Sequence, residues 1–155
     1  MAKESTHKDV AVNRKAFHDF FIEEKMEAGL VLKGTEVKSL REGKANLRES
    51  YARAERGKVV LHQCHIGGYS HGNMMNHEPV RPRTLLLHRK EINKLIGRVQ
   101  QRGLTLIPLR IYFTPRGFAK IELALARGKK HYDQRETLKK REAGREIERA
   151  MKERK

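Results

Sequence analysis

The sequence predicts a mainly β protein: a small antiparallel, OB-like barrel with two to three short helices and a basic C-terminal tail. Three observations favour this fold class. Short alternating or β-branched apolar runs recur along the chain before residue 127, glycines and prolines separate them, and only one long stretch has helical apolar spacing. OB-like barrels commonly bind nucleic acid, although periodicity alone does not separate them from other small barrels.

The N-terminal part of the chain predicts a flexible lead-in followed by strands. Residues 1–9 are polar and are expected to be flexible. Residues 17–32 place large apolar side chains among glutamates and lysines, which predicts two short strands joined near Met26.

A short helix and a hairpin are expected next. Thr35 is a suitable N-cap, Glu36 suits the positive end of the helix dipole, and Gly43 ends the helix. Residues 47–54 and 58–66 have the composition of strands, with a turn-forming glycine between them, so a β-hairpin is the simplest connection.

The C-terminal part of the barrel contains the clearest helix. Residues 67–83 are rich in glycine and proline and predict a long loop. Residues 87–102 carry apolar side chains at i, i+3, i+4 and i+7, and Gly103 follows as a stop signal. Residues 105–113 and 118–126 then predict two strands joined by a tight turn.

Composition divides the chain into a barrel at residues 10–127 and a tail at residues 128–155. The tail is almost wholly charged, and its few large apolar side chains cannot offset the entropy of ordering the backbone. We therefore expect the tail to be disordered alone and to become helical only against a partner. A thin apolar stripe at Ile147 and Met151 is the face that such a partner would contact.

The charge of the chain points to a polyanionic partner. Among 155 residues, 35 Lys and Arg oppose 19 Asp and Glu, which gives a net charge of +16 and a pI near 10.3. Nucleic acid and anionic membrane surfaces both attract such a protein. No apolar run approaches the roughly 20 residues of a membrane-spanning helix, and we expect no membrane partner. One cysteine and no signal-peptide pattern predict a cytoplasmic location.

The sequence offers no convincing catalytic or metal site. His62, Cys64 and His65 lack the paired spacing of a structural zinc site. The segment from Gly34 to Lys38 lacks the second glycine of a phosphate-binding loop. We therefore expect a protein that is not an enzyme and that holds no metal and no cofactor.

Basic side chains are instead the candidate binding groups. Lysines and arginines cluster along the barrel and at the tail junction, where phosphate contact explains them best. The chain has no Trp and few other aromatic residues, which favours folded or double-helical RNA over single strands. The clusters contain Arg14, Lys15, Lys33, Lys38, Arg41, Lys44, Arg81, Arg83, Lys129 and Lys130.

Several ordered strings resemble the SsrA-binding protein family (small protein B). They are Asn13-Arg14-Lys15-Ala16, Glu27-Ala28-Gly29-Leu30, Gly34-Thr35-Glu36-Val37-Lys38-Ser39-Leu40-Arg41, Asn76-His77-Glu78-Pro79, Arg83-Thr84-Leu85-Leu86-Leu87-His88, Gly128-Lys129-Lys130 and Asp133-Gln134-Arg135-Glu136. The resemblance covers residues 10–151. It implies an OB-type barrel that binds the tRNA-like domain of transfer-messenger RNA and enters stalled ribosomes in trans-translation. Elongation factor Tu is then the partner that delivers the complex and carries the GTP chemistry.

The resemblance also implies roles for individual residues. Glu27, Leu86 and His88 fall where the family contacts transfer-messenger RNA, although His88 stands where asparagine is common. Tail residues fall where the family occupies the decoding region of the small subunit and the empty message channel. They are Lys129, Lys130, Tyr132, Asp133, Arg135, Lys139, Lys140, Ile147 and Met151. We expect the protein to be a monomer.

Two other functions fit the same composition. A protein bound permanently to ribosomal RNA would have the same charge and tail, and it would bind any intact subunit. A structural protein whose tail pairs with an acidic partner would bind RNA with little dependence on RNA identity. The RNA that co-purifies with the protein distinguishes these alternatives.

Overall fold

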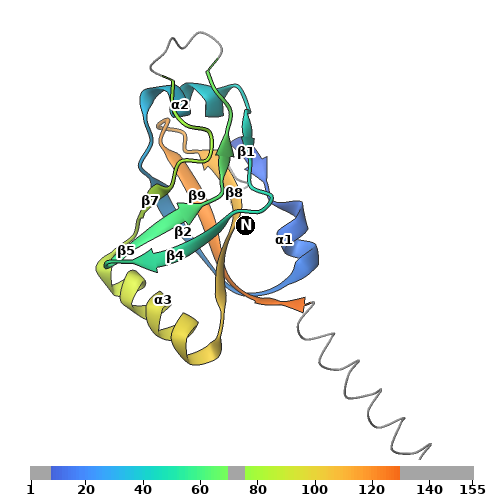
Figure 1. The fold of residues 1–155 in the computed structure, drawn as a ribbon, viewed down its shortest axis with the longest axis vertical. Coiled ribbons are helices and arrows are strands. Elements are labelled where there is room, and N and C mark those ends of the chain that lie inside the picture. The colour runs from blue at the N-terminus through green and yellow to red at the C-terminus, as the bar shows by residue number, and fades with distance from the viewer. Residues whose placement is uncertain (1–7, 70–75, 130–155) are drawn as a thin grey trace, which may run out of the picture.

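The strands of this protein pair into a closed ring, as a computed structural model describes for residues 8–69 and 76–129 (Figure 1). The order β1-β8-β4-β5-β7-β2-β9 is closed by a further pairing between β8 and β9, and every pairing is antiparallel. This ring confirms the predicted small antiparallel barrel. Its strands are β1 (Lys8–Val12), β2 (Phe20–Leu30), β4 (Tyr51–Glu55), β5 (Lys58–His62), β7 (Arg83–Leu86), β8 (Thr105–Phe113) and β9 (Ala119–Gly128).

The main core fills the barrel and extends to the third helix. Alternate residues of β9 face inward, and Ile121, Leu123 and Leu125 are completely buried. Leu95 of α3 (Arg89–Arg102) belongs to the same core, so this helix covers one end of the barrel. A smaller cluster beneath α1 (Arg14–Asp19) contains Ala16, Ile107, Leu109, Ala124 and Ala126.

The prediction for residues 17–32 is wrong in two respects. Residues 14–19 form helix α1, because the Asn13 side chain accepts a hydrogen bond from the Ala16 amide and donates to the carbonyls of Leu47 and Pro108. The rest is one strand, β2, which bends at a bulge between Ile22 and Glu24. It has no break at Met26, because β9 pairs with β2 along nearly its whole length.

The N-terminal boundary also differs from the prediction. Lys8 and Asp9 belong to β1 and pair with Phe113 and Tyr112 of β8, although the sequence placed them in the flexible lead-in. Strand β1 has only five residues and no turn signal before it, so its own sequence does not identify it as a strand. Its pairing with β8 is what makes it one.

The second helix is confirmed, but its cap differs. Helix α2 (Gly34–Arg41) follows an N-cap at Lys33, not at Thr35. The Glu36 carboxylate accepts the Lys33 amide at 2.8 Å, which satisfies one of the free amide groups at the helix start. Gly43, with a φ of 74°, closes the helix as predicted.

The predicted hairpin is confirmed with shorter strands, β4 and β5. Arg56 and Gly57 have φ values of 50° and 77°, which suit a two-residue turn whose twist matches the flanking strands. Residues 47–50 form a turn before β4. Residues 65–66 belong to a separate two-stranded pairing between β3 (Ala45–Asn46) and β6 (His65–Ile66).

Helix α3 and the hairpin of β8 and β9 match the sequence most closely. Helix α3 begins two residues later than predicted and ends at Gly103, which is left-handed as expected. Strand β8 has the predicted bounds, and β9 extends two residues further, to Gly128. The short strand β7 was not predicted, because it joins the barrel only through its pairing with β2 and β5.

Candidate nucleic-acid interface

A cleft of about 510 Å³ opens where β2, β7, β9 and the start of α3 meet. It brings together three residues that the sequence associated with RNA, Glu27, Leu86 and His88, from three different elements. The full lining is Glu27, Gly29, Leu86, Leu87, His88, Glu91 and Lys120. The cleft therefore combines two carboxylates, a lysine, a histidine and an exposed apolar surface.

Strand pairing at Gly29 gives the cleft its floor. Gly29 lies opposite Leu86, and a Cβ atom at position 29 would lie 3.2 Å from the Leu86 Cβ. Glycine is therefore the residue that allows β7 to lie this close without displacing Leu86. The Leu86 side chain remains 59% exposed, which makes it one of the most exposed large apolar side chains among the described residues.

His88 stands at the N-cap of α3 but does not cap it with its side chain. Its backbone is extended, with φ −65° and ψ 145°, and the ring makes no capping hydrogen bond. The first turn of the helix contains Glu91, whose negative charge interacts favourably with the positive end of the helix dipole. The exposed imidazole of His88 consequently lines the cleft and does not stabilise the helix terminus.

Glu27 is held by a tyrosine from a strand that does not pair with its own. The Tyr112 hydroxyl on β8 donates a hydrogen bond to Oε2 of Glu27 on β2, across the intervening strand β9. Burial, with the hydrogen bond to Glu27, raises the pKa of the Tyr112 phenol far above its usual value. Tyr112 therefore remains a hydrogen-bond donor throughout the neutral range.

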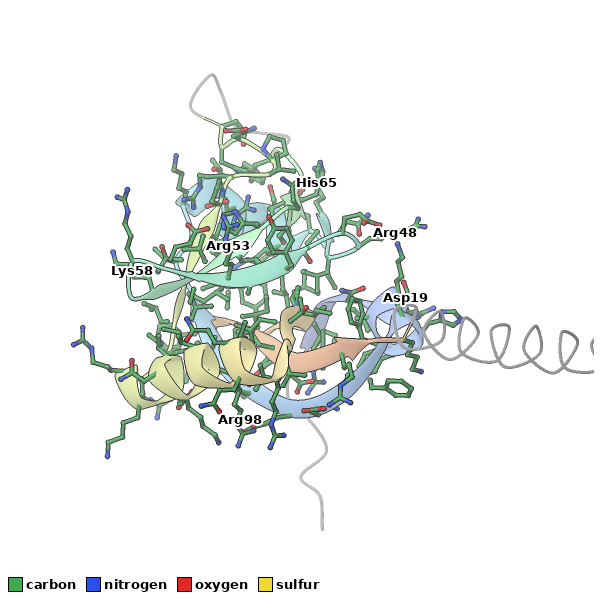
Figure 2. The ribbon with its side chains drawn as sticks, turned by 60° about the horizontal axis from the view of Figure 1, so that its bottom comes forward. Asp19, Arg48, Arg53, Lys58, His65 and Arg98 are labelled. Atoms are coloured by element: carbon green, nitrogen blue, oxygen red, sulfur yellow. The ribbon has the colours of Figure 1, made fainter. Side chains whose placement is uncertain are left out.

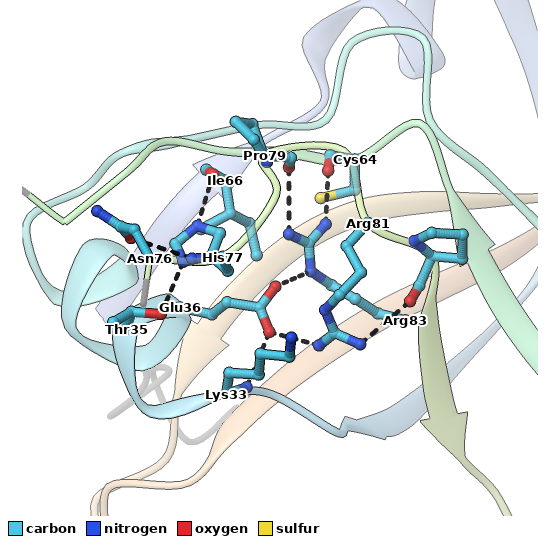
Figure 3. Close-up of polar contacts among 11 residues, drawn as sticks. Lys33, Thr35, Glu36, Cys64, Ile66, Asn76, His77, Pro79, Arg81 and Arg83 are labelled. Carbon is cyan, nitrogen blue, oxygen red and sulfur yellow. Dashed lines mark hydrogen bonds and ion pairs between the residues drawn. The ribbon is translucent and has the colours of Figure 1, made fainter. Parts of the chain in front are cut away.

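A buried ion network fixes the loop that leads into β7 (Figure 3). The Glu36 carboxylate lies between two guanidinium groups, at 2.5 Å from Nη2 of Arg81 and in contact with Nε of Arg83. Arg83 also donates to the carbonyls of Cys64, at 2.6 Å, and Pro79, at 3.1 Å. Both Glu36 and Arg83 are fully buried, so each charge depends on the other for compensation.

The protonation of Glu36 follows from these contacts. Burial alone would raise the pKa of Glu36, but hydrogen bonds from Arg81, the Lys33 amide and Arg83 outweigh it and lower the pKa. A depressed carboxyl pKa in the folded state contributes stability that is present at neutral pH and is lost as the pH falls through that pKa.

A histidine anchors the same loop. His77 is buried, and its Nε2 lies 2.9 Å from the Ile66 carbonyl, which can only accept a hydrogen bond. Nε2 therefore carries a proton and donates. Nδ1 lies 2.9 Å from the Thr35 hydroxyl, which ties the loop to helix α2. Thr35, predicted as a cap, thus serves a tertiary contact.

The other basic candidates are dispersed over the barrel. On α2, Lys38 lies 5.4 Å from the Tyr69 ring and Arg41 lies 5.3 Å from the Phe113 ring. On α1, Arg14 is exposed and Lys15 pairs with Glu49 at 2.8 Å. Figure 2 likewise shows Lys58 and Arg48 on opposite sides of the molecule, so cations cover more than one face.

The structure separates the predicted site residues into groups. Glu27, Leu86 and His88 share the cleft, Lys38 and Arg41 lie on α2, and Arg14 and Lys15 lie on α1. Lys129 follows β9, with Nζ 4.9 Å from the Phe21 ring. Lys130, Tyr132, Asp133, Arg135, Lys139, Lys140, Ile147 and Met151 lie outside the described residues.

Arg83 requires a correction. The sequence placed it among the RNA contacts because it is basic and lies beside other cations. Its side chain has no exposed area, and all its described partners belong to the barrel. A guanidinium that is completely buried inside the fold cannot reach a phosphate, so Arg83 is a structural residue.

Sequence reasoning missed Lys120, Glu91 and Tyr112. Lys120 lies beside the fully buried Ile121 on β9, but nothing in the local sequence links it to Leu86 or His88. Tyr112 lies in a nearly continuous apolar run, where its hydroxyl gives no sequence signal of a partner.

Residues 8–69 and 76–129 contain neither a metal-binding cluster nor a membrane-spanning helix. No group of three or more histidine, cysteine, aspartate or glutamate side chains in this part of the chain could hold a metal ion. Burial raises the pKa of the Cys64 thiol to about 11, which makes it a poor metal ligand at neutral pH. None of the helices in the described segments is long and apolar enough to cross a membrane.

Known proteins of one family match this sequence over nearly the whole chain. Residues 10–153 match the model of the family described as SmpB protein. SsrA-binding proteins of Moorella thermoacetica and Geobacillus kaustophilus are each 59% identical over 147 residues, which is 95% of this chain and 95% and 94% of theirs. A solved structure described as "tmRNA-SmpB: a journey to the center of the bacterial ribosome" is 50% identical. It has a TM-score of 0.66 and covers 81% of this chain and 85% of that one.

Proposed function

Because the chain belongs to the SmpB family, the non-catalytic transfer-messenger RNA-binding proteins of trans-translation, we propose that its cleft docks on the tRNA-like domain of that RNA. The observation that carries this proposal is the meeting of Glu27, Leu86 and His88 in one cleft. These residues come from β2, β7 and the start of α3, and only the folded barrel brings them together.

The chemistry of the cleft suits RNA that is folded but has unpaired bases. Leu86 offers apolar contact to a base or ribose, and the His88 ring offers a face on which a base can stack. Lys120 supplies a charge for phosphate. The Glu27 carboxylate accepts hydrogen bonds from RNA donors and repels phosphate, so the cleft discriminates between groups on the RNA surface.

A charge placed at the edge of the cleft tests this proposal. We expect Leu86→Asp to weaken binding of the tRNA-like domain at least about tenfold, because an acid would face the RNA backbone. Leu86 is mostly exposed, so the fold should tolerate the change. The measurement is a titration of labelled RNA followed by fluorescence anisotropy.

Val80→Asp is the matched control, because it introduces the same charge at a 39% exposed valine that does not line the cleft. It should bind with nearly wild-type affinity. Equal weakening by both variants would indicate a general charge effect and would contradict the assignment of the cleft.

Phosphate contacts supply the rest of the affinity. Arg14, Lys15, Lys38 and Arg41 are exposed on α1 and α2, and Lys129 follows β9. With about 4–6 phosphates neutralised, the logarithm of the binding constant should fall against the logarithm of salt concentration with a slope of about −3 to −5. Titrations at four or more salt concentrations measure this slope, and a value near zero would remove phosphate contact as the main source of affinity.

The remaining proposed partners also take part in trans-translation. The ribosome is the site of action, and elongation factor Tu delivers the complex of protein and RNA, so the chain itself needs no cofactor. Lys129, Lys130 and the tail enter the decoding region and the vacant message channel, where the segment around Ile147 and Met151 becomes helical. We propose a cytoplasmic monomer, and the RNA that co-purifies with it from cells tests the assignment against ribosomal RNA binding.

A further inference from the structure

Glu27 is an unusual group for an RNA interface. It is an exposed carboxylate in a chain of net charge +16, and it lines the cleft proposed to bind RNA. An ionised carboxylate only accepts hydrogen bonds and is repelled by phosphate. Its partner on RNA must therefore be a donor, either an N–H group of a base or a ribose 2′-hydroxyl.

A glutamate side chain alone is poorly suited to this task. It has three rotatable bonds, and ordering it on binding costs conformational entropy. Here Oε2 is already bonded to the Tyr112 hydroxyl. Within the described residues Oε1 of Glu27 makes no hydrogen bond, so this oxygen can accept one from a ligand.

Tyr112 is itself firmly placed. The residue is only 3% exposed, and the Arg110 guanidinium lies 5.2 Å from the centre of its ring. Arg110 is held in turn by Glu122 at 3.2 Å and by Asp9 at 3.5 Å. The chain of contacts runs from Asp9 on β1 through two residues of β8 to Glu27 on β2, and Glu122 of β9 supports it at Arg110.

We propose that Tyr112 is a positioning residue for RNA recognition: its hydroxyl holds the Glu27 carboxylate in the orientation that accepts a hydrogen bond from an RNA donor in the cleft. This inference rests on the proposed function and extends it to a residue outside the cleft lining. The hydroxyl fixes the carboxylate before RNA arrives, so that less entropy is lost on binding.

A double-mutant cycle tests the inference. Tyr112→Phe, Glu27→Ala and the double variant are titrated against the tRNA-like domain of transfer-messenger RNA at one salt concentration. We expect Tyr112→Phe to weaken binding about tenfold, equivalent to about 1.4 kcal/mol. Glu27→Ala should weaken binding at least as much. The double variant should bind no more weakly than Glu27→Ala, because the hydroxyl acts only through the carboxylate.

Two controls separate positioning from stability. Tyr51→Phe removes a hydroxyl from a tyrosine on β4 whose ring stacks on His62 at 5.4 Å, outside the cleft, and it should bind RNA normally. The urea midpoint of Tyr112→Phe should stay close to that of the wild type, because the ring that packs in the barrel is retained.

The possible outcomes are distinguishable. Weaker binding by Glu27→Ala but not by Tyr112→Phe overturns the positioning role and leaves the proposed function standing. Additive losses also overturn it, since Tyr112 would then act through another group. Wild-type binding by Glu27→Ala contradicts the cleft assignment itself.

Modified RNA then identifies the donor. One series carries 2′-deoxy nucleotides at unpaired positions, and the other replaces unpaired guanosines with inosine, which lacks the 2-amino group. Loss of the Glu27 effect in the first series assigns a ribose hydroxyl, and loss in the second assigns a base amino group. If the Glu27 effect survives in both series, the ribose hydroxyl and the guanine 2-amino group are excluded, and the donor is restricted to another N–H group of an unpaired base.

Discussion

Replacing Arg83 with alanine should destabilise the protein by about 3–5 kcal/mol, because the buried Glu36 carboxylate would lose the one of its two guanidinium partners that is fully buried. The Cys64 carbonyl would lose its donor as well. A domain of this size is stable by about 5–15 kcal/mol in total, so much of the folding free energy would be lost. Urea unfolding followed by circular dichroism should show the midpoint falling by about 2 M.

Arg53→Ala provides the matched control. Arg53 also forms an ion pair, with Glu55 at 2.7 Å, but its side chain is 62% exposed. Removing this surface pair should change stability by no more than about 1 kcal/mol. If Arg83→Ala instead matches the control in stability and weakens RNA binding, Arg83 is a ligand contact and the buried network is misassigned.

Ending the chain after Gly128 should abolish the tagging of incomplete proteins while the barrel still binds transfer-messenger RNA within about twofold to threefold of the full chain. Within the described residues the core ends in β9, where Ala126 is the last fully buried apolar side chain. The cleft is likewise formed before this point. The truncation removes the interaction of the tail with the ribosome and the phosphate contact of Lys129, and the loss of this one contact accounts for the small decrease in RNA affinity.

Two measurements check the truncation. RNA affinity comes from the anisotropy titration, and tagging comes from a reconstituted translation reaction that stalls on a message without a stop codon. The full chain added to the same reaction should restore tagging. A truncated protein that loses RNA affinity as severely as tagging would contradict the division between barrel and tail.

Local signals explain which elements the sequence predicts well. Helix α3 has helical apolar spacing and a left-handed glycine at its end, and the hairpin of β8 and β9 has alternating strands about a clear turn. Helix α1 has only six residues and relies on contacts of Asn13 with residues 47 and 108, which lie far away in the sequence. Such an element cannot be recognised from its own residues.

The site was predictable only in part for the same reason. Resemblance to a family supplied Glu27, Leu86 and His88, but the closeness of the first two arises from the pairing of β2 with β7. Charge alone misplaced Arg83, because arginines are usually exposed and its buried partner, Glu36, lies 47 residues away. Tyr112 was missed because a hydroxyl in an apolar strand reveals its partner only in three dimensions.

The position of β9 has a mechanical consequence. This strand pairs with β2 along one edge and with β8 along the other, and its last residue, Gly128, leads directly into the tail. A force that pulls the tail along the strand direction loads both ladders in shear, so many hydrogen bonds must break together. A strand at an open edge would carry the same load on one ladder only. Among the described strands, β9 is therefore well placed to act as an anchor, and the barrel should withstand traction on its C-terminus during movement through the ribosome.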